Sequence, residues 1–184
     1  MTALTSQFIS IPNLITFARI ILIPVFVTAL VYQRYDYALA LFVVASLTDM
    51  LDGLMARLTD QKTKLGAFLD PLADKVLLLT SFILFSVYGW VPTWLTITVI
   101  SRDLTVTLGW LLLYLTSDIT RVEPTFIGKT AIASQLLLIA YVLLAINLPS
   151  LPDEAPKLFM WIVAGLTIVS GLQYVYRGLT QNEK

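Results

Sequence analysis

The chain has 184 residues, of which 58% are hydrophobic and only 13% are charged, and its formal net charge is zero. A soluble domain is about half apolar and about a quarter charged, so this composition is typical of an integral membrane protein. The zero net charge excludes a generally basic surface for nucleic acid, and the lack of cysteine and histidine excludes disulfides, thiolate metal sites and imidazole catalysis.

Six apolar stretches follow one another along the chain, and each is close to the roughly 20 residues that a helix needs to cross a bilayer. Pro12 fits the start of the first stretch, and polar, glycine or proline residues separate the others. The sequence therefore predicts an all-α, polytopic membrane protein with six transmembrane helices in a single domain, residues 1–184. The expected helices cover residues 13–32, 36–58, 66–88, 92–116, 126–147 and 155–177.

The basic residues predict how these helices are oriented. With six spans both termini lie on one side, and nine basic residues share that side: Arg19, Arg57, Lys62, Lys64, Lys75, Arg121, Lys129, Arg177 and Lys184. The other side has only Arg34 and Lys157, while Arg102 falls near the middle of the fourth span. The positive-inside rule then places both termini in the cytosol. The first ten residues resemble neither a secretory signal nor a mitochondrial transit peptide, which favours a bacterial inner membrane.

Four aspartates interrupt this apolar pattern, in the segment DMLDGLMARLTDQKTKLGAFLDPLADK. A carboxylate at bilayer depth costs roughly 2.5–3.5 kcal/mol on insertion scales, so four of them need compensation. Asp49 and Asp52 are three residues apart on the second expected helix, and Asp70 and Asp74 are four apart on the third. Each pair therefore lies on one helix face. If the two helices pack antiparallel, the pairs face each other on the cytosolic side.

Such an all-oxygen set suits Mg²⁺ or Mn²⁺, and four carboxylates are enough for two ions at the spacing used in phosphoryl-type transfer. Gly53 keeps the second helix narrow, and Arg57, one turn later, can hold a phosphate with two hydrogen bonds. A structural ion-pair network is an alternative, but one arginine cannot neutralise four acids. A carboxylate site for cation transport is a second alternative.

The spacing Asp49-x2-Asp52-Gly53-x2-Ala56-Arg57-x8-Gly66-x3-Asp70-x3-Asp74 matches the signature of the CDP-alcohol phosphotransferase family at every position. The chain resembles this family over essentially its whole length. The resemblance implies an enzyme that transfers a phosphoalcohol unit from a CDP-alcohol to an acceptor hydroxyl and releases CMP. It also implies a homodimer.

The same resemblance implies the roles of individual residues. Asp49, Asp52 and Asp70 would bind two Mg²⁺ or Mn²⁺ ions, and Asp74 would be a further metal ligand and the general base. The CDP moiety would be bound by Asn13, Gly53, Arg57 and Thr63. The phosphate of the acceptor would be bound by Arg19, Arg102 and Lys129. For Arg19 the alternative is a side chain that snorkels to the inner leaflet, and for Arg102 it is an ion pair with Asp103.

Within the family, the chain is most similar to enzymes that use CDP-diacylglycerol to make anionic phospholipids. ISRDLTV and PTFIGKTAIASQL resemble cardiolipin synthases of this family, whose acceptor is phosphatidylglycerol. Phosphatidylglycerophosphate synthases, whose acceptor is glycerol 3-phosphate, usually have Ala-Arg-Glu at residues 101–103 and a further arginine where this chain has Trp110. A small dianion needs more cations than a lipid phosphodiester, so the sequence favours phosphatidylglycerol and leaves glycerol 3-phosphate as the alternative.

Three other classes of protein fit the sequence less well. A carboxylate-based cation transporter would be expected to have paired repeats or paired broken helices, and only one acid cluster is present. An inactive relative would usually have lost one of the four aspartates. A cardiolipin synthase of the phospholipase D type is excluded, because it needs a catalytic histidine and the chain has none.

Overall fold

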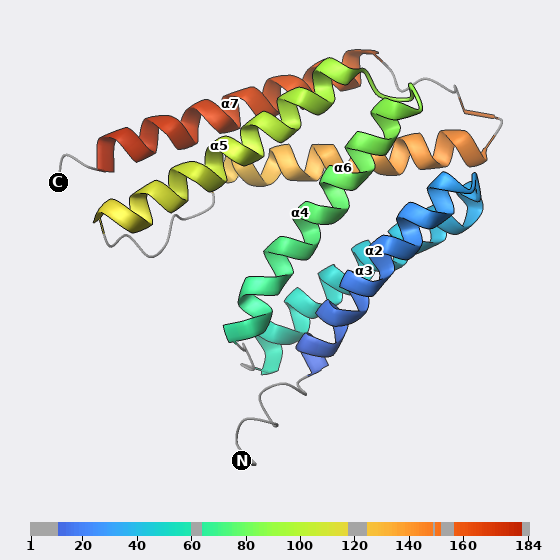
Figure 1. The fold of residues 1–184 in the computed structure, drawn as a ribbon, viewed down its shortest axis with the longest axis horizontal. Helices are drawn as coiled ribbons and strands as arrows, with labels where there is room; N and C mark the ends of the chain where they lie inside the picture. Colours follow the sequence, from blue (N-terminus) through green and yellow to red (C-terminus); the bar gives the residue numbers. More distant parts are fainter. Residues whose placement is uncertain (1–10, 60–63, 118–124, 149, 152–156, 182–184) are drawn as a thin grey trace. The chain divides into compact units, whose positions relative to one another are not determined.

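The computed structural model describes residues 11–59, 64–117, 125–148, 150–151 and 157–181. Within these ranges, side chains are described except at 11–17, 49–59, 64–72, 74, 110–111, 113–117, 179 and 181. The described residues form helices joined by short turns, with no strand (Figure 1). The helices are α2 (Ile11–Val31), α3 (Tyr35–Thr59), α4 (Lys64–Val87), α5 (Thr93–Ser117), α6 (Phe126–Asn147) and α7 (Lys157–Gln181). The expected six helices are confirmed, with ends that differ by at most four residues.

The chain divides into two compact units, and the division falls inside α4. The first unit comprises Met1–Leu84 with Ile146–Leu148, and the second comprises Phe85–Ala145 with Pro149–Lys184. Each unit has its own pair of closely packed helices, α2 with α3 and α5 with α7.

In the first unit, α2 and α3 lie side by side and run in opposite directions (Figure 1). Ile23, Phe26 and Leu30 of α2 are buried at helical spacing and face a matching set on α3 that includes Phe42. The rings of Phe26 and Phe42 have centroids 6.4 Å apart. This apolar contact between two helices joined by a short turn fixes which ends of α2 and α3 lie together.

The turn between α2 and α3 is a Schellman motif, in which the backbone closes the helix with two hydrogen bonds. The N–H of Arg34 donates to the carbonyl oxygen of Ala29 at 2.8 Å, and the N–H of Gln33 donates to the carbonyl oxygen of Leu30 at 3.0 Å. Gln33 adopts a positive φ of 56°, a conformation that usually selects glycine. The motif therefore holds the chain reversal with some backbone strain at Gln33.

In the second unit, α5 and α7 lie side by side (Figure 1), and the rings of Trp94 and Trp161 stack with centroids 4.7 Å apart. A second Schellman motif, with Gly89 at a φ of 78°, ends α4 ahead of α5. Thr125 caps the start of α6, because its hydroxyl accepts a hydrogen bond from the N–H of Gly128 at 3.0 Å. Local capping thus defines the helix ends that the sequence punctuation predicts.

Helix α7 combines buried polar side chains with exposed large apolar side chains, unlike a surface helix in water. Its buried face includes the hydroxyls of Thr167 and Ser170, both 0% exposed, whereas Trp161, Ile168 and Leu172 are at least half exposed. Among the described residues, α6 and the segment Lys157–Gly178 of α7 are long and apolar enough to cross a membrane. Apolar residues outside and polar residues inside fit a helix surrounded by lipid.

The strain at Gln33 gives a test of the turn. Gln33→Gly should stabilise the purified protein by about 1 kcal/mol, because glycine adopts a left-handed conformation without a Cβ clash. Gln33→Val should destabilise it by about 1–3 kcal/mol, because a β-branched side chain fits this φ poorly. Thermal unfolding in detergent measures both effects. Equal midpoints for the two variants would contradict the assigned turn.

Candidate active site

The topology of the first unit brings three helix segments to one end. The N-terminal half of α2, the C-terminal half of α3 and the start of α4 lie there together (Figure 1). The gap from Thr59 to Lys64 can span at most about 18 Å, which keeps the end of α3 near the start of α4. These segments carry most of the predicted site residues, namely Asn13, Arg19, Asp49, Asp52, Gly53, Arg57, Asp70 and Asp74.

The backbone confirms that the two aspartate pairs stand on helices. Asp49 and Asp52 lie on α3, about 4.5 Å apart along its axis, and Asp70 and Asp74 lie on α4, about 6 Å apart. The side chains of the four aspartates, and of Asn13, Gly53 and Arg57, fall outside the described set, and Thr63 falls outside the described residues altogether. Among the side chains that the structure describes, no three acidic groups gather closely enough to hold a metal. The metal and CDP ligands therefore remain predictions.

Arg19 is the one predicted site residue of the first unit whose side chain is described. It is only 1% exposed, although it lies on an apolar helix that contributes Ile23 and Phe26 to the core. A snorkelling arginine would extend its guanidinium toward the aqueous surface. The burial of Arg19 therefore favours an internal role at the end of the unit that carries the aspartates.

Arg102, the predicted acceptor-binding residue of α5, is anchored inside the second unit. Its side chain is buried at 7% exposure; Nη1 donates to Oδ1 of Asp103 at 2.7 Å, and Nη2 donates to Oγ of Ser170 at 2.8 Å. The ion pair proposed as the alternative role of Arg102 is thus present, and a serine of α7 joins it. Its Nε is buried with no hydrogen-bond partner, so this guanidinium keeps one donor for a further acceptor.

Tyr174 of α7 connects Arg102 to the first turn of α6. The guanidinium carbon of Arg102 lies 5.6 Å from the centroid of the Tyr174 ring, within the range of a cation–π contact. The Tyr174 hydroxyl accepts a hydrogen bond from the N–H of Thr125 at 3.3 Å, and a Cβ added at Gly128 would meet the tyrosine at 3.2 Å. Lys129 follows Gly128 and its side chain is exposed. Tyr174 therefore contacts both Arg102 and the turn that carries Lys129.

A neighbouring contact joins α6 and α7 through a buried amide. Nε2 of Gln135 donates to the hydroxyl of Thr167 at 2.9 Å, and both side chains are 0% exposed. Thr167, Ser170 and Tyr174 follow one another at spacings of three and four residues, so they form a polar stripe on one face of α7. This stripe was not among the features predicted from the sequence. The sequence nevertheless contains a signal for it, because polar residues recur at helical spacing within this apolar segment.

Close approach of α5 and α7 depends on Gly171. A Cβ added there would meet Cγ of Arg102 at 3.3 Å, which is tight for a real contact. Small residues at helix–helix contacts let the backbones come together and help buried polar groups to bond across the contact. Gly171 therefore makes room for Arg102 beside Ser170.

The family model described as CDP-alcohol phosphatidyltransferase matches residues 9–169. Since this match covers most of the chain and includes the whole aspartate motif, the protein belongs to the CDP-alcohol phosphatidyltransferase family.

Named relatives include two kinds of enzyme. The CDP-diacylglycerol–glycerol-3-phosphate 3-phosphatidyltransferase of Bacillus subtilis is 34% identical over 183 residues, covering 90% of this chain and 93% of that protein. The enzyme of the same name from Salmonella typhimurium is 33% identical over 172 residues, with 90% and 93% coverage. The cardiolipin synthase (CMP-forming) of Rattus norvegicus is 34% identical over 186 residues, covering 92% of this chain and 61% of that protein. Similar identities to both kinds leave the acceptor open.

The polar stripe of α7 gives a test of how Arg102 is held. Ser170→Ala removes the acceptor of Nη2 and leaves a second donor of a buried guanidinium without a partner, which should destabilise the protein by about 1–3 kcal/mol. Ser101→Ala is the matched control, because Ser101 precedes Arg102 and its side chain is exposed. Unfolding in detergent measures both variants. Equal stability of the two variants would contradict the Arg102–Ser170 contact.

Proposed function

We propose that the protein is an integral membrane enzyme that transfers the phosphatidyl group of CDP-diacylglycerol to an acceptor hydroxyl, with release of CMP. One observation carries this proposal. The family motif falls on α3 and α4 of one compact unit, and these helices bring its acidic residues to the end where α2 places Asn13 and Arg19. The reaction forms a bond between the acceptor oxygen and the phosphorus, and it breaks the bond from that phosphorus to CMP.

The donor chemistry of the site fits divalent metal ions. Asp49, Asp52 and Asp70 supply only carboxylate oxygens, and Asp74 adds a fourth carboxylate on α4. Hard cations such as Mg²⁺ and Mn²⁺ prefer such ligands, and the set is large enough for two ions. Ions bound there would neutralise the pyrophosphate and the departing phosphate of CMP. Metal binding would also account for four ionised acids in an apolar protein.

The remaining motif residues bind and orient the nucleotide. Arg57 lies one turn after Gly53 on α3, so the two residues share a helix face on which the guanidinium would bind a phosphate. Asn13 and Thr63 complete the proposed CDP site. Asp74 accepts the proton of the acceptor hydroxyl as the new bond forms, which is the role of a general base.

For the acceptor we propose phosphatidylglycerol, which makes the protein a cardiolipin synthase. The charge of α5 supports this choice. Arg102 and Asp103 are its only charged residues, and they form a 2.7 Å ion pair, so α5 has no net charge. Trp110 occupies the position at which a second cation would bind a small dianion. Arg102, Arg19 and Lys129 then bind the single phosphodiester charge of a lipid acceptor.

Glycerol 3-phosphate is the second candidate acceptor. The Bacillus subtilis and Salmonella typhimurium relatives named for this acceptor are each covered over 93% of their length, whereas the rat cardiolipin synthase is covered over 61%. This end-to-end similarity favours glycerol 3-phosphate, and the charge balance of α5 favours phosphatidylglycerol. A cation transporter has no such support, because the family match includes Gly53 and Arg57, which suit a nucleotide.

The proposed cellular setting follows from the same helices. The protein would cross a bacterial inner membrane six times, with both termini and the aspartates on the cytosolic side, where CDP-linked substrates are available. Two apolar helices and the family membership support a membrane location. A homodimer is part of the proposal because the family resemblance implies one.

The base assignment has a direct test. Asp74→Asn should lower CMP release from CDP-diacylglycerol by about 10²–10⁴-fold, because an amide cannot accept the acceptor proton. Binding of CDP should persist, since Asp49, Asp52 and Arg57 are unchanged. Asp36→Asn is the control: this exposed acid stands at the opposite end of α3. Normal turnover by Asp74→Asn would refute the base role.

The acceptor assignment is tested at Trp110. Trp110→Arg should raise the rate with glycerol 3-phosphate relative to phosphatidylglycerol, because a second cation on α5 favours a dianion. Competition between the two acceptors in one CMP-release assay measures this ratio. Trp90→Arg, a change of the same kind in the turn before α5, is the control. An unchanged acceptor ratio in Trp110→Arg would contradict the charge argument.

A further inference from the structure

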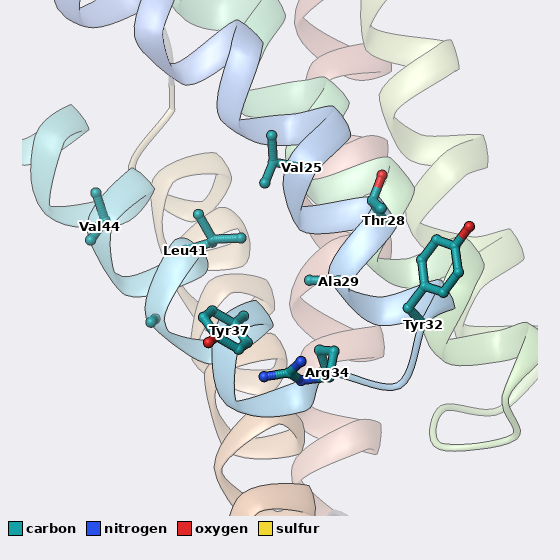
Figure 2. A pocket seen from close by; sticks show the side chains of 9 residues that line it. Val25, Thr28, Ala29, Tyr32, Arg34, Tyr37, Leu41 and Val44 are labelled. Atoms are coloured by element: carbon teal, nitrogen blue, oxygen red, sulfur yellow. The ribbon is translucent and has the colours of Figure 1, made fainter.

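A groove of about 460 Å³ lies between α2 and α3, at the end of the first unit opposite the aspartates. Figure 2 shows its walls, with Val25, Thr28 and Ala29 on α2 and Leu41 and Val44 on α3. Binding pockets for small molecules measure about 300–1,000 Å³, so the groove is large enough for part of a lipid. None of the residues that line it belongs to the predicted active site.

The long walls of the groove are apolar. Val25 and Val44 are 47% exposed, and Ala29 and Ala40 provide the depth because their side chains are small. The hydroxyl of Thr28 donates to the carbonyl of Pro24 at 2.8 Å, so its hydrogen bond is made within α2. A flexible hydrocarbon chain matches walls of this kind, because it needs no hydrogen bonds and buries apolar surface.

The end of the groove at the α2–α3 turn is cationic and aromatic (Figure 2). The guanidinium carbon of Arg34 lies 4.4 Å from the centroid of the Tyr37 ring, which restrains the side chain. Asp36 contacts only Nε, at 3.6 Å, and both side chains are more than half exposed, so this ion pair is weak. The two Nη groups of Arg34 can therefore donate to a phosphate.

Tyr32 and Tyr37, both exposed at this end, suit the boundary between hydrocarbon and headgroups, where tyrosine is enriched. We propose that the groove between α2 and α3 binds one anionic phospholipid, with an acyl chain along Val25, Leu41 and Val44 and the headgroup phosphate on Arg34. Charge complementarity at Arg34 selects a phospholipid over an uncharged apolar molecule. In the proposed orientation Arg34 lies on the non-cytosolic side, so this lipid occupies the leaflet opposite the reaction and is not the substrate.

Photo-crosslinking of the full chain in phosphatidylcholine vesicles tests this site. The probes are phosphatidylserine and phosphatidylcholine, each with a diazirine on one acyl chain; phosphatidylserine is anionic but is neither the proposed donor nor the proposed acceptor. Peptide mapping should place adducts within residues 25–44, with a higher yield for phosphatidylserine. Arg34→Gln should lower the phosphatidylserine yield about fivefold, toward that of phosphatidylcholine. Lys157→Gln, which removes the other basic residue of that side, should leave it unchanged.

A second pair of variants tests the groove itself. Ala40→Trp fills the groove from an exposed position and should reduce adducts of both probes in residues 25–44. Ala133→Trp places the same side chain on an exposed position of α6 and should have no effect. Adducts that persist in Ala40→Trp would overturn the site, and an unchanged lipid preference in Arg34→Gln would overturn the phosphate contact. Absence of adducts from residues 25–44 with both probes would overturn the lipid site and favour a protein partner at the groove.

Discussion

A charged or polar group inside apolar helices must be paired with another group, and this constraint organises the structure. Arg102 is buried on an apolar helix, and Asp103, Ser170 and Tyr174 surround its guanidinium. In the same unit, the buried Nε2 of Gln135 donates a hydrogen bond to the hydroxyl of Thr167. The polar stripe of α7 therefore faces the protein, whereas large apolar side chains such as Trp161, Ile168 and Leu172 are exposed. In a lipid environment this arrangement keeps the polar groups of the stripe away from the hydrocarbon.

The same constraint applies to the charged residues that each of the two units carries. The first unit carries four acids near the ends of α3 and α4, where divalent ions would supply the missing charge. The second unit carries Arg102, whose buried Nε has no hydrogen-bond partner and can donate to a further group. Lys129 is exposed in the first turn of α6, which Tyr174 links to Arg102. Nucleotide chemistry is thus proposed for α2–α4, and Arg19, Arg102 and Lys129 are proposed to bind the acceptor.

Much of the fold could be predicted because apolar length and punctuation are local properties. The six helices were predicted within four residues at every end, since Pro12, Gly89 and the polar connections act over one turn. The residues around Arg102 were harder to predict, because Ser170 and Tyr174 are about 70 residues further along the chain. Only packing of α5 against α7 brings them together. The left-handed Gln33 was also missed, because the turn selects a conformation that glutamine rarely adopts.

The central claim is that the aspartate motif transfers a phosphatidyl group from CDP-diacylglycerol, and its most direct test is CMP release by the purified protein. The assay supplies CDP-diacylglycerol, Mg²⁺ or Mn²⁺, and either phosphatidylglycerol or glycerol 3-phosphate. The account predicts metal-dependent CMP release that requires an acceptor and is faster with phosphatidylglycerol. No CMP release with either acceptor at any metal concentration would contradict it.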